Sequence, residues 1–274
     1  MTSLVSWIGI DSRAPASLYL ASDSRVSWDP VRGWNHGRKV FASRLRPDIF
    51  GYCGDVLFPS LFLGQAIELI DDGLLFSTAA DHCARATELM SFAAAAFLSY
   101  PVTERQPFQF VYGSRDGSGM KSLFQVSVIA WEARAGFALT HQTVPQQSAP
   151  LIVLGSGRNS VDKWYERWNR TDHKRTSRAV FSAFCDSLSA GDDPRSGGAP
   201  QLVGIYRQGS ARTIGAVFRS QKYRLGLSVD CPTSSLEWRN ELFELCDGLT
   251  GEKLPTAQTH HAPRGLGNSR PKWA

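Results

Sequence analysis

The chain begins MTSLVSW, and Thr2 is the first residue whose type and place could do chemistry. Threonine is small enough for an aminopeptidase to remove Met1, which would leave Thr2 with a free α-amine beside its hydroxyl. Because an α-amine titrates near neutral pH, such a residue can supply nucleophile and general base together. Threonine at this position is also common in proteins without this chemistry, so the assignment depends on groups elsewhere in the chain.

An amino-terminal nucleophile needs a cation that lowers the pKa of the amine, a carboxylate that holds the cation, and backbone N–H groups that receive an oxyanion. Asp23 ends an apolar segment in YLASDSR, and Lys39 follows 16 positions later in GRKVF. Each residue alone is typical of a surface charge, and their separation does not imply contact. They are the candidates for the carboxylate and the cation.

The elements that would position these groups follow from apolar periodicity. SLVSWIGI and ASLYLASDSRVSW flank the turn signal DSRAPAS and predict a hairpin, and KVFASRL and DIFGYCGD predict two more strands before any helix. Helices are predicted over 58–70, 77–99, 159–169, 176–189 and 234–246, with further strands between them. This order predicts an α+β fold in which two antiparallel sheets pack face to face with helices outside, a four-layer αββα sandwich.

Composition indicates one domain. With 274 residues, of which 42% are hydrophobic, we expect a single domain over 1–249 and a disordered tail over 250–274 that is rich in Pro, Gly and polar residues. No run of about 18 apolar residues and no secretory signal is present, which favours a cytoplasmic protein without a membrane partner. The net charge of +5 admits an acidic partner, but the basic residues are scattered, so a solvated surface is favoured over nucleic-acid binding.

Cysteine and histidine spacing predicts neither a metal nor a cofactor. The cysteines form no CxxC pair and are expected to be reduced, mostly buried thiols: Cys53, Cys83, Cys185, Cys231 and Cys246. The histidines show no ligand-like spacing apart from His260 and His261 in the tail.

Six short motifs together resemble the catalytic β-subunits of the proteasome family, including the peptidase ring of the bacterial ATP-dependent two-component protease. TSLVSW is similar to the family's mature start, ASDSR to the strand with its acidic residue, GRKVF to the strand with its lysine, and GYCGD to its GxxGD turn. LGSGRNS resembles the GSG that opens a helix, and DDPRSGG the D-x-x-S-G-G that ends the next helix. The matches occur in the family's order over residues 2–207.

The resemblance implies a threonine peptidase of the N-terminal-nucleophile (Ntn) hydrolase class. Thr2 would be the nucleophile, Lys39 the cation beside it, and Asp23 the partner that orients the lysine. Gly51, the first glycine of GYCGD, would donate the N–H group to the oxyanion.

The resemblance also implies a proton relay and an assembly. Ser156, Asp193 and Ser196 would hydrogen-bond around the threonine amine. The family works without a metal in stacked rings with inward-facing sites, so a homo-oligomeric ring or spiral is expected. The substrate would be a peptide or an unfolded protein. The resemblance also allows for a regulatory partner of unknown identity.

The resemblance further implies a substrate pocket lined by Val26, Ile49 and Cys53, from the strands around the lysine and the GxxGD turn. None of these residues is charged. Burying an unpaired charge among them is costly, whereas an apolar side chain gains about 1.5 to 3 kcal/mol. Cleavage after Leu, Tyr or Phe is therefore expected to exceed cleavage after Glu or Arg.

Several alternatives stay open at this level. The gap from Thr2 to Asp23 is longer than the family's by several residues, and little resemblance extends beyond LVGIYR. A ring subunit without activity, or an Ntn hydrolase of a small amide, would share the same motifs. LIVLGSGRNSVDKW could be a phosphate-binding turn, and Cys53 could be a thiol nucleophile, although a packed thiol is favoured.

Overall fold

The computed structural model describes residues 2–29, 31–76, 81–230 and 236–256, in which the strands form two main sheets and a short hairpin. The nine strands of the larger sheet are β1 (Leu4–Ile10), β2 (Pro15–Ser22), β10 (Ala149–Leu154), β11 (Gln201–Tyr206), β12 (Arg212–Phe218), β13 (Gln221–Arg224), β14 (Leu227–Ser228), β15 (Trp238–Asn240) and β16 (Leu245–Cys246). The five strands of the smaller sheet are β5 (Val40–Ala42), β6 (Asp48–Gly54), β7 (Phe108–Asp116), β8 (Leu123–Glu132) and β9 (Gly136–Gln142).

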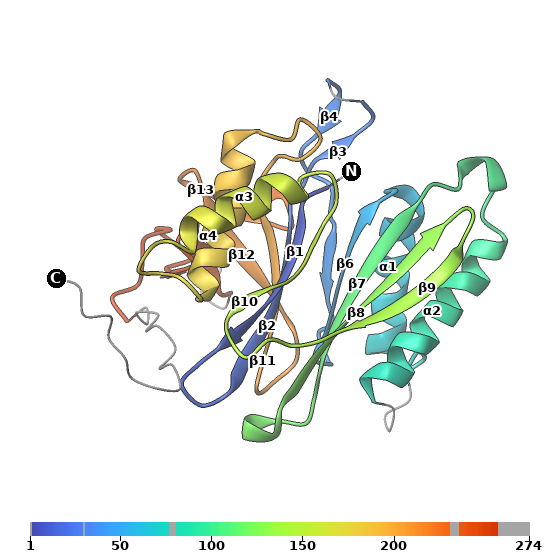
Figure 1. The fold of residues 1–274 in the computed structure, drawn as a ribbon, viewed down its shortest axis with the longest axis horizontal. Helices are drawn as coiled ribbons and strands as arrows, with labels where there is room; N and C mark the ends of the chain where they lie inside the picture. Colours follow the sequence, from blue (N-terminus) through green and yellow to red (C-terminus); the bar gives the residue numbers. More distant parts are fainter. Residues whose placement is uncertain (1, 30, 77–80, 231–235, 257–274) are drawn as a thin grey trace.

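The helices lie on the outer sides of the two sheets (Figure 1). The α-helices of the described residues are α1 (Leu57–Asp71), α2 (His82–Leu98), α3 (Arg158–Trp168) and α4 (Ser177–Ala190), and the 3-10 turns are Val102–Glu104 and Gly119–Lys121. Helices α1 and α2 contact the smaller sheet, whereas α3 and α4 contact β1 and β10 of the larger sheet. The expected mixture of helices and mainly antiparallel sheets is therefore confirmed.

Strand β1 is apolar at almost every position because both of its faces are covered. Successive side chains of a strand point to opposite faces. Leu4 and Ile8 lie in the core between the two sheets, while Val5 and Trp7 pack in the core that α4 covers. Ser6 is also buried, and its hydroxyl donates to the carbonyl oxygen of Tyr19 at 3.1 Å.

Side-chain caps mark where two helices begin. Asp81 accepts a hydrogen bond from the N–H of Ala84 before α2, and Thr176 accepts one from the N–H of Ala179 before α4. Such caps satisfy N–H groups that have no partner within the helix. The helix predicted over 77–99 therefore begins at His82, and residues 77–80 lie outside the described residues.

The helix predicted over 234–246 is wrong for the described part, residues 236–246. Here β15 pairs in parallel with β12 and turns back into β16. Trp238 is buried over Gly215, where a β-carbon would lie 2.3 Å from its ring, and Phe243 adopts a φ of 59° in the turn. The apolar residues of this segment fit the spacing of a helix as well as that of a strand. The segment forms a strand because the edge of β12 is open for pairing.

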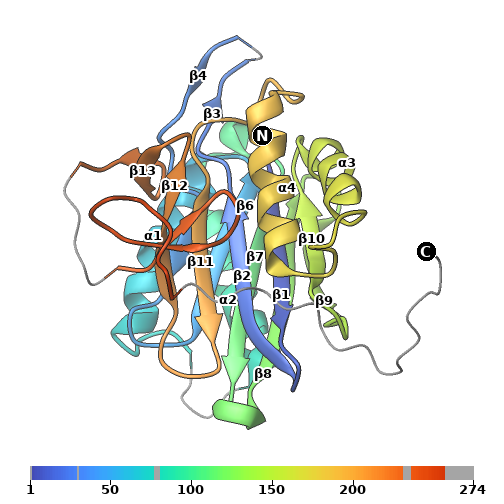
Figure 2. The ribbon, with the colours of Figure 1, turned by 90° about the vertical axis from the view of Figure 1, so that its left-hand side faces the viewer.

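A short hairpin of β3 (Val26–Ser27) and β4 (Gly33–Trp34) projects beyond the body of the molecule (Figures 1 and 2). The sequence predicted one continuous strand over ASLYLASDSRVSW, but the structure ends β2 at Ser22. Asp23 follows the last residue of β2, and its N–H still donates to the carbonyl oxygen of Ser3 at 3.1 Å.

The first residues of the predicted tail contact the larger sheet. Leu254 donates its N–H to Leu245, so the first residues of the predicted tail are bound to β16, while 257–274 lie outside the described residues. The domain limits stay a prediction.

Within the described chain, no helix is long and apolar enough to cross a membrane. The free thiols there are Cys53, Cys185 and Cys246, which are buried, and Cys83, which is exposed; Cys231 lies outside the described part.

A buried histidine joins α2 to the smaller sheet. His82 shares hydrogen bonds with the hydroxyls of Ser114, at 2.6 Å, and Ser127, at 2.7 Å, and its ring stacks on Tyr112. Burial, reinforced by the positive charge of Arg85, lowers the pKa of His82 from 6.5 to about 4. The imidazole is therefore neutral in the folded protein at neutral pH.

Acid should destabilise the protein through His82. Between pH 6.5 and 4 the unfolded chain binds a proton that folded His82 does not, so the free energy of unfolding falls as pH falls, by up to about 3 kcal/mol. Urea unfolding of wild type and His82→Gln measures the difference, which should shrink toward low pH. His36→Gln, at an exposed histidine, is the matched control. A constant difference across this range would contradict the assignment.

Candidate active site

Thr2, Asp23 and Lys39 meet in a fully buried cluster, and each has 0% exposure. The ammonium of Lys39 donates to the Thr2 hydroxyl at 2.9 Å, to Asp23 Oδ1 at 2.7 Å and to the carbonyl oxygen of Arg25 at 2.5 Å. All three of its N–H groups therefore have acceptors. The structure thus brings together three residues that the sequence could only name separately.

The register of the β1–β2 hairpin places Thr2 beside Asp23. Leu4 lies opposite Ser22, and one step further the N–H of Asp23 donates to the carbonyl oxygen of Ser3 at 3.1 Å. In return, the N–H of Ser3 donates to Asp23 Oδ1 at 3.1 Å. Lys39 enters from the other sheet, directly before β5, so the cluster spans both sheets.

Asp23 is bound by backbone N–H groups as well as by Lys39. Its Oδ2 accepts from Arg25 at 3.1 Å and from Gly197 at 2.9 Å. Burial lowers the pKa of Lys39 below its usual value, and the charge and hydrogen bond of Asp23 offset part of that shift. The pair is therefore a fully buried ammonium held by one carboxylate, one hydroxyl and one carbonyl oxygen.

Ser156, Asp193 and Ser196 form a second cluster that reaches Thr2 through Ser3. Asp193 Oδ2 accepts from the hydroxyl of Ser156 at 2.6 Å and from that of Ser196 at 2.7 Å. The hydroxyl of Ser3 donates to Ser196 Oγ at 2.9 Å. Burial raises the pKa of Asp193, but the two serine hydrogen bonds and an N–H from Arg195 outweigh it, so that pKa is lowered overall.

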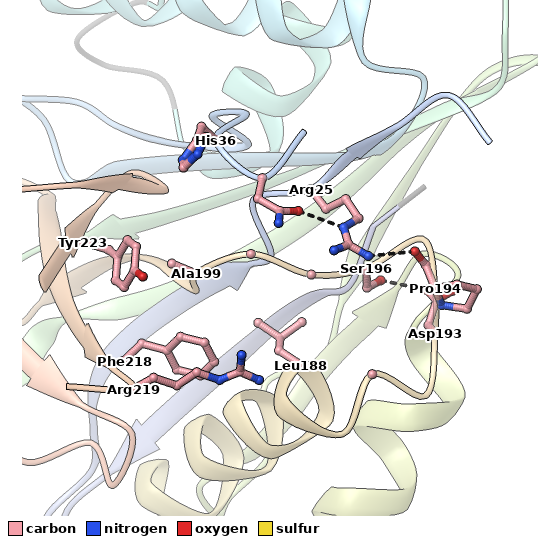
Figure 3. A pocket seen from close by; sticks show the side chains of 14 residues that line it. Arg25, His36, Leu188, Asp193, Pro194, Ser196, Ala199, Phe218, Arg219 and Tyr223 are labelled. Carbon is pink, nitrogen blue, oxygen red and sulfur yellow. Dashed lines mark hydrogen bonds between the residues drawn. The ribbon is translucent and has the colours of Figure 1, made fainter. Parts of the chain in front are cut away.

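Arg25 connects the projecting hairpin to the loop with Asp193 and Ser196 (Figure 3). Its Nε donates to Asn35 Oδ1 at 2.8 Å, and one terminal nitrogen donates to the carbonyl oxygen of Pro194 at 2.9 Å. A cavity of about 360 Å³ lies beside this bridge. Arg25 is the last residue of the ASDSR motif, and nothing in the motif indicated this contact with the Asp193 loop.

Gly155 and Gly157, the two glycines of the GSG motif, pack directly against the start of the chain. A β-carbon on Gly155 would lie 1.8 Å from the carbonyl oxygen of Thr2, and one on Gly157 would lie 1.8 Å from Ser3 Oγ. The turn after β10 is thus filled by the start of the chain rather than open. This packing argues against a phosphate-binding turn, because Thr2 and Ser3 occupy the space above it.

Gly51 lies within β6, opposite Val40 on one side and Val111 on the other. A β-carbon there would be 2.7 Å from Leu20 Cδ2 and 3.0 Å from Leu4 Cδ1, so a larger residue would have to displace these leucine side chains between the sheets. The role of its N–H as an oxyanion donor stays a prediction.

The three predicted pocket residues occupy different surroundings. Ile49 is 1% exposed in the core between the sheets, and half-buried Val26 packs on Gly37. Cys53 lines a cavity of about 250 Å³ together with Gly155. Burial raises the pKa of the Cys53 thiol to about 12, and the charge of Lys39 lowers it only in part, which disfavours a thiolate nucleophile.

The described part of the chain contains no group of three or more His, Cys, Asp or Glu side chains that could hold a metal ion. The chemistry that the cluster can perform is proton transfer and nucleophilic attack, because it combines a hydroxyl, an ammonium and hydrogen-bonded carboxylates.

Comparison with known proteins supports the fold alone. No family model and no curated protein sequence matches the chain. Among solved structures it is similar to Anbu (ancestral β-subunit) from Yersinia bercovieri, with a TM-score of 0.52 and 11% identity over 81% of this chain and 87% of that one. It is also similar to eukaryotic HslV from Trypanosoma brucei, with a TM-score of 0.46 and 9% identity over 74% of this chain and 99% of that one. The chain therefore has a proteasome-like fold.

Gly155→Ala should destabilise the protein strongly, because the added methyl meets backbone atoms of Thr2 and the residue has a φ of 88°. Gly136→Ala is the matched control, with a φ of 72° and open space around it. The control isolates the cost of the backbone conformation, about 1 to 2 kcal/mol. Urea unfolding should show Gly155→Ala to be less stable than Gly136→Ala by at least about 2 kcal/mol. Equal losses would mean that the contact with Thr2 contributes nothing.

Proposed function

We propose that the protein is a threonine peptidase of the Ntn class whose nucleophile, Thr2, is exposed by removal of Met1. The supporting observation is the hydrogen bond from the Lys39 ammonium to Thr2 Oγ1, made while Asp23 holds the ammonium in full burial. In this proposal the fold is the four-layer αββα sandwich of that class. The proteasome-like fold supports the proposal without testing the chemistry.

The proposed reaction starts with proton transfer within one residue. The free amine of Thr2 takes the hydroxyl proton, and Oγ1 attacks the carbonyl carbon of a peptide bond. The amine then gives that proton to the leaving nitrogen as the C–N bond breaks, which leaves an ester on Thr2. Water, deprotonated by the same amine, hydrolyses the ester and restores the hydroxyl.

Lys39 would act through its charge. An ammonium 2.9 Å from Thr2 Oγ1 favours the alkoxide that develops during attack, and it lowers the pKa of the nearby amine so that the amine is free to act as base. Asp23 would act as a positioning residue because it binds the ammonium, not the substrate.

The serine and aspartate cluster would complete the site. In the proposal, Ser156, Asp193 and Ser196 orient the amine of Thr2 and relay its proton, and their bond to Ser3 supports this role. Gly51 would stabilise the oxyanion through its N–H.

Covalent labelling tests the nucleophile directly. A threonine-directed peptide epoxyketone reacts with both the hydroxyl and the free amine, so intact mass should show a species without Met1 that gains one inhibitor mass. Thr2→Ala should lose labelling and peptide hydrolysis, while Thr2→Ser, which keeps the hydroxyl, should retain labelling. Full activity in protein that keeps Met1 would refute the proposal. Absent labelling and hydrolysis in Met1-free protein would favour a scaffold.

A test of Lys39 must separate the effect of its loss on turnover from the effect on stability. Lys39→Met leaves a buried carboxylate without its cation and should cost about 3 to 5 kcal/mol of stability. Asp23→Asn combined with Lys39→Met removes both charges, so it should recover much of the stability while turnover falls at least about 100-fold. Urea unfolding and a fluorogenic peptide assay measure the two effects. Wild-type turnover in the folded double variant would rule out Lys39.

We also propose a closed ring or spiral of identical subunits, because a peptidase of broad reach is safe only where its sites are enclosed. Multi-angle light scattering at micromolar concentration should give a mass several times the 30.2 kDa of the chain. A monodisperse monomer would contradict this assembly and leave the small-amide hydrolase as the better candidate.

A further inference from the structure

A second cavity is formed by residues of β12 and β13 in the larger sheet and by residues directly after β5, the edge strand of the smaller sheet. It has a volume of about 460 Å³. Its polar lining residues are Ser43, Arg44, Arg212, Thr213, Arg224 and Glu237. No residue of the candidate active site lines it, so any ligand here would bind at a separate place.

Two arginines at this cavity share a single carboxylate. Glu237 accepts a hydrogen bond from Arg239 Nε at 2.8 Å, while Nη1 of Arg212 lies 3.7 Å from its other carboxylate oxygen. Arg44 is paired elsewhere, with two carboxylates of α1 at 3.3 and 3.6 Å. Glu237 thus neutralises only one of the two positive charges next to it.

Arg224 adds a positive charge that no carboxylate neutralises. Within the described part of the chain, no carboxylate lies within ion-pair distance of its guanidinium, and its buried Nη1 has no hydrogen-bond partner. Burial alone lowers the pKa of Arg224. Burial also lowers the pKa of Arg38; Glu68 offsets part of that shift, and the charge of Arg224 adds to it. Because arginine stays protonated at neutral pH, Arg224 remains a partly buried charge without a counter-charge.

The excess of positive charge suits a compact dianion. Three arginines, Arg212, Arg224 and Arg239, lie at or beside the cavity, and one carboxylate opposes them, which leaves an excess of two charges. A phosphate group carries about 1.5 to 2 negative charges near neutral pH, and a guanidinium can bind two of its oxygens at once. A carboxylate carries one charge and would leave part of the excess. Thr213 adds a hydroxyl that can donate to an anion.

We propose that this cavity binds the phosphate group of a small solute, with Arg224 and Arg212 as its cationic ligands. The site goes beyond the proposed peptidase function and does not depend on it. Its volume is within the range of about 300 to 1,000 Å³ that small-molecule sites occupy. Bound phosphate would supply the counter-charge that Arg224 lacks, so binding should stabilise the folded chain.

Isothermal titration calorimetry on the full-length protein measures this binding directly. At low salt, with EDTA to exclude binding through a metal, inorganic phosphate and glycerol 3-phosphate should each bind at least about tenfold more tightly than succinate. Succinate is the matched control for charge because it is a dianion of two carboxylates. The tighter of the two phosphates identifies the source of the phosphate group as the free anion or a phosphomonoester.

Substitutions of single arginines test the assigned ligands. Arg224→Met keeps much of the apolar stem without the charge and should weaken phosphate binding at least about tenfold, because charge-assisted hydrogen bonds are lost. Arg212→Met should weaken it in the same direction, and it tests the site independently of how Arg224→Met folds. Arg134→Met, at an exposed arginine in the turn between β8 and β9, controls for net charge and should leave the affinity unchanged.

Urea unfolding separates a binding role of Arg224 from a structural one. Without phosphate, Arg224→Met should be at least as stable as wild type, because it removes a charge that has no counter-charge. Phosphate should then stabilise wild type and Arg134→Met but not Arg224→Met. A clear loss of stability in Arg224→Met without phosphate would assign the guanidinium to the fold and overturn its role as a ligand.

The remaining outcomes decide the site without reference to peptide hydrolysis, so failure of the peptidase proposal leaves them unaffected. Phosphate binding that both cavity variants weaken and the control retains supports the site. Succinate binding as tight as that of phosphate overturns the assignment to phosphate. An equal loss in Arg134→Met overturns the site, because binding would then follow net charge alone. Absent phosphate binding, or binding that Arg224→Met leaves unchanged, also overturns it.

Discussion

The buried ion pair of Lys39 and Asp23 is the interaction on which the rest of the site depends. Neither side chain is exposed, so both charges have lost their water, and this loss costs several kcal/mol unless other polar groups replace it. The replacement comes from the hydroxyl of Thr2, the carbonyl oxygen of Arg25 and N–H groups that bind Asp23. Residues from both sheets must therefore be in place together for the pair to be stable.

Close packing of glycines around the chain's start is the second constraint. Gly155 and Gly157 let the turn before α3 lie directly on Thr2 and Ser3, and Gly197 approaches Asp23 so that its N–H can donate. Side chains at the first two positions would push the turn away and open the polar cluster to water. The site is thus a contact between three backbone segments, and the absence of a β-carbon at Gly155 allows the turn to lie directly on the backbone of Thr2.

The likeness to Anbu at 11% identity shows how little of this fold depends on particular apolar residues. A core accepts many combinations of side chains as long as volume and polarity pattern are kept. The buried polar groups are more demanding, because a buried charge or hydroxyl needs a partner at a fixed distance. A shared fold does not by itself imply a shared chemistry, because activity depends on these polar groups.

Much of the fold could be predicted from the sequence, because strand and helix periods are local properties. The alternation in SLVSWIGI predicted β1, and the helices over 159–169 and 176–189 differ from α3 and α4 by one residue at each end. The segment 236–246 could not be assigned correctly, since its apolar spacing suits a helix until the edge of β12 is available for pairing.

The candidate site, like the fold, could be predicted only in part. The sequence by itself determined which residues could act, because Thr2, Asp23 and Lys39 have the required chemical types in recognisable motifs. Only the tertiary structure decided that they touch, that Ser3 links them to Asp193 through Ser196, and that Cys53 lines a small cavity while Ile49 lies in the core. The reason is physical: reactivity belongs to side-chain type, but contact and burial arise from strand register and sheet packing between residues far apart in the chain.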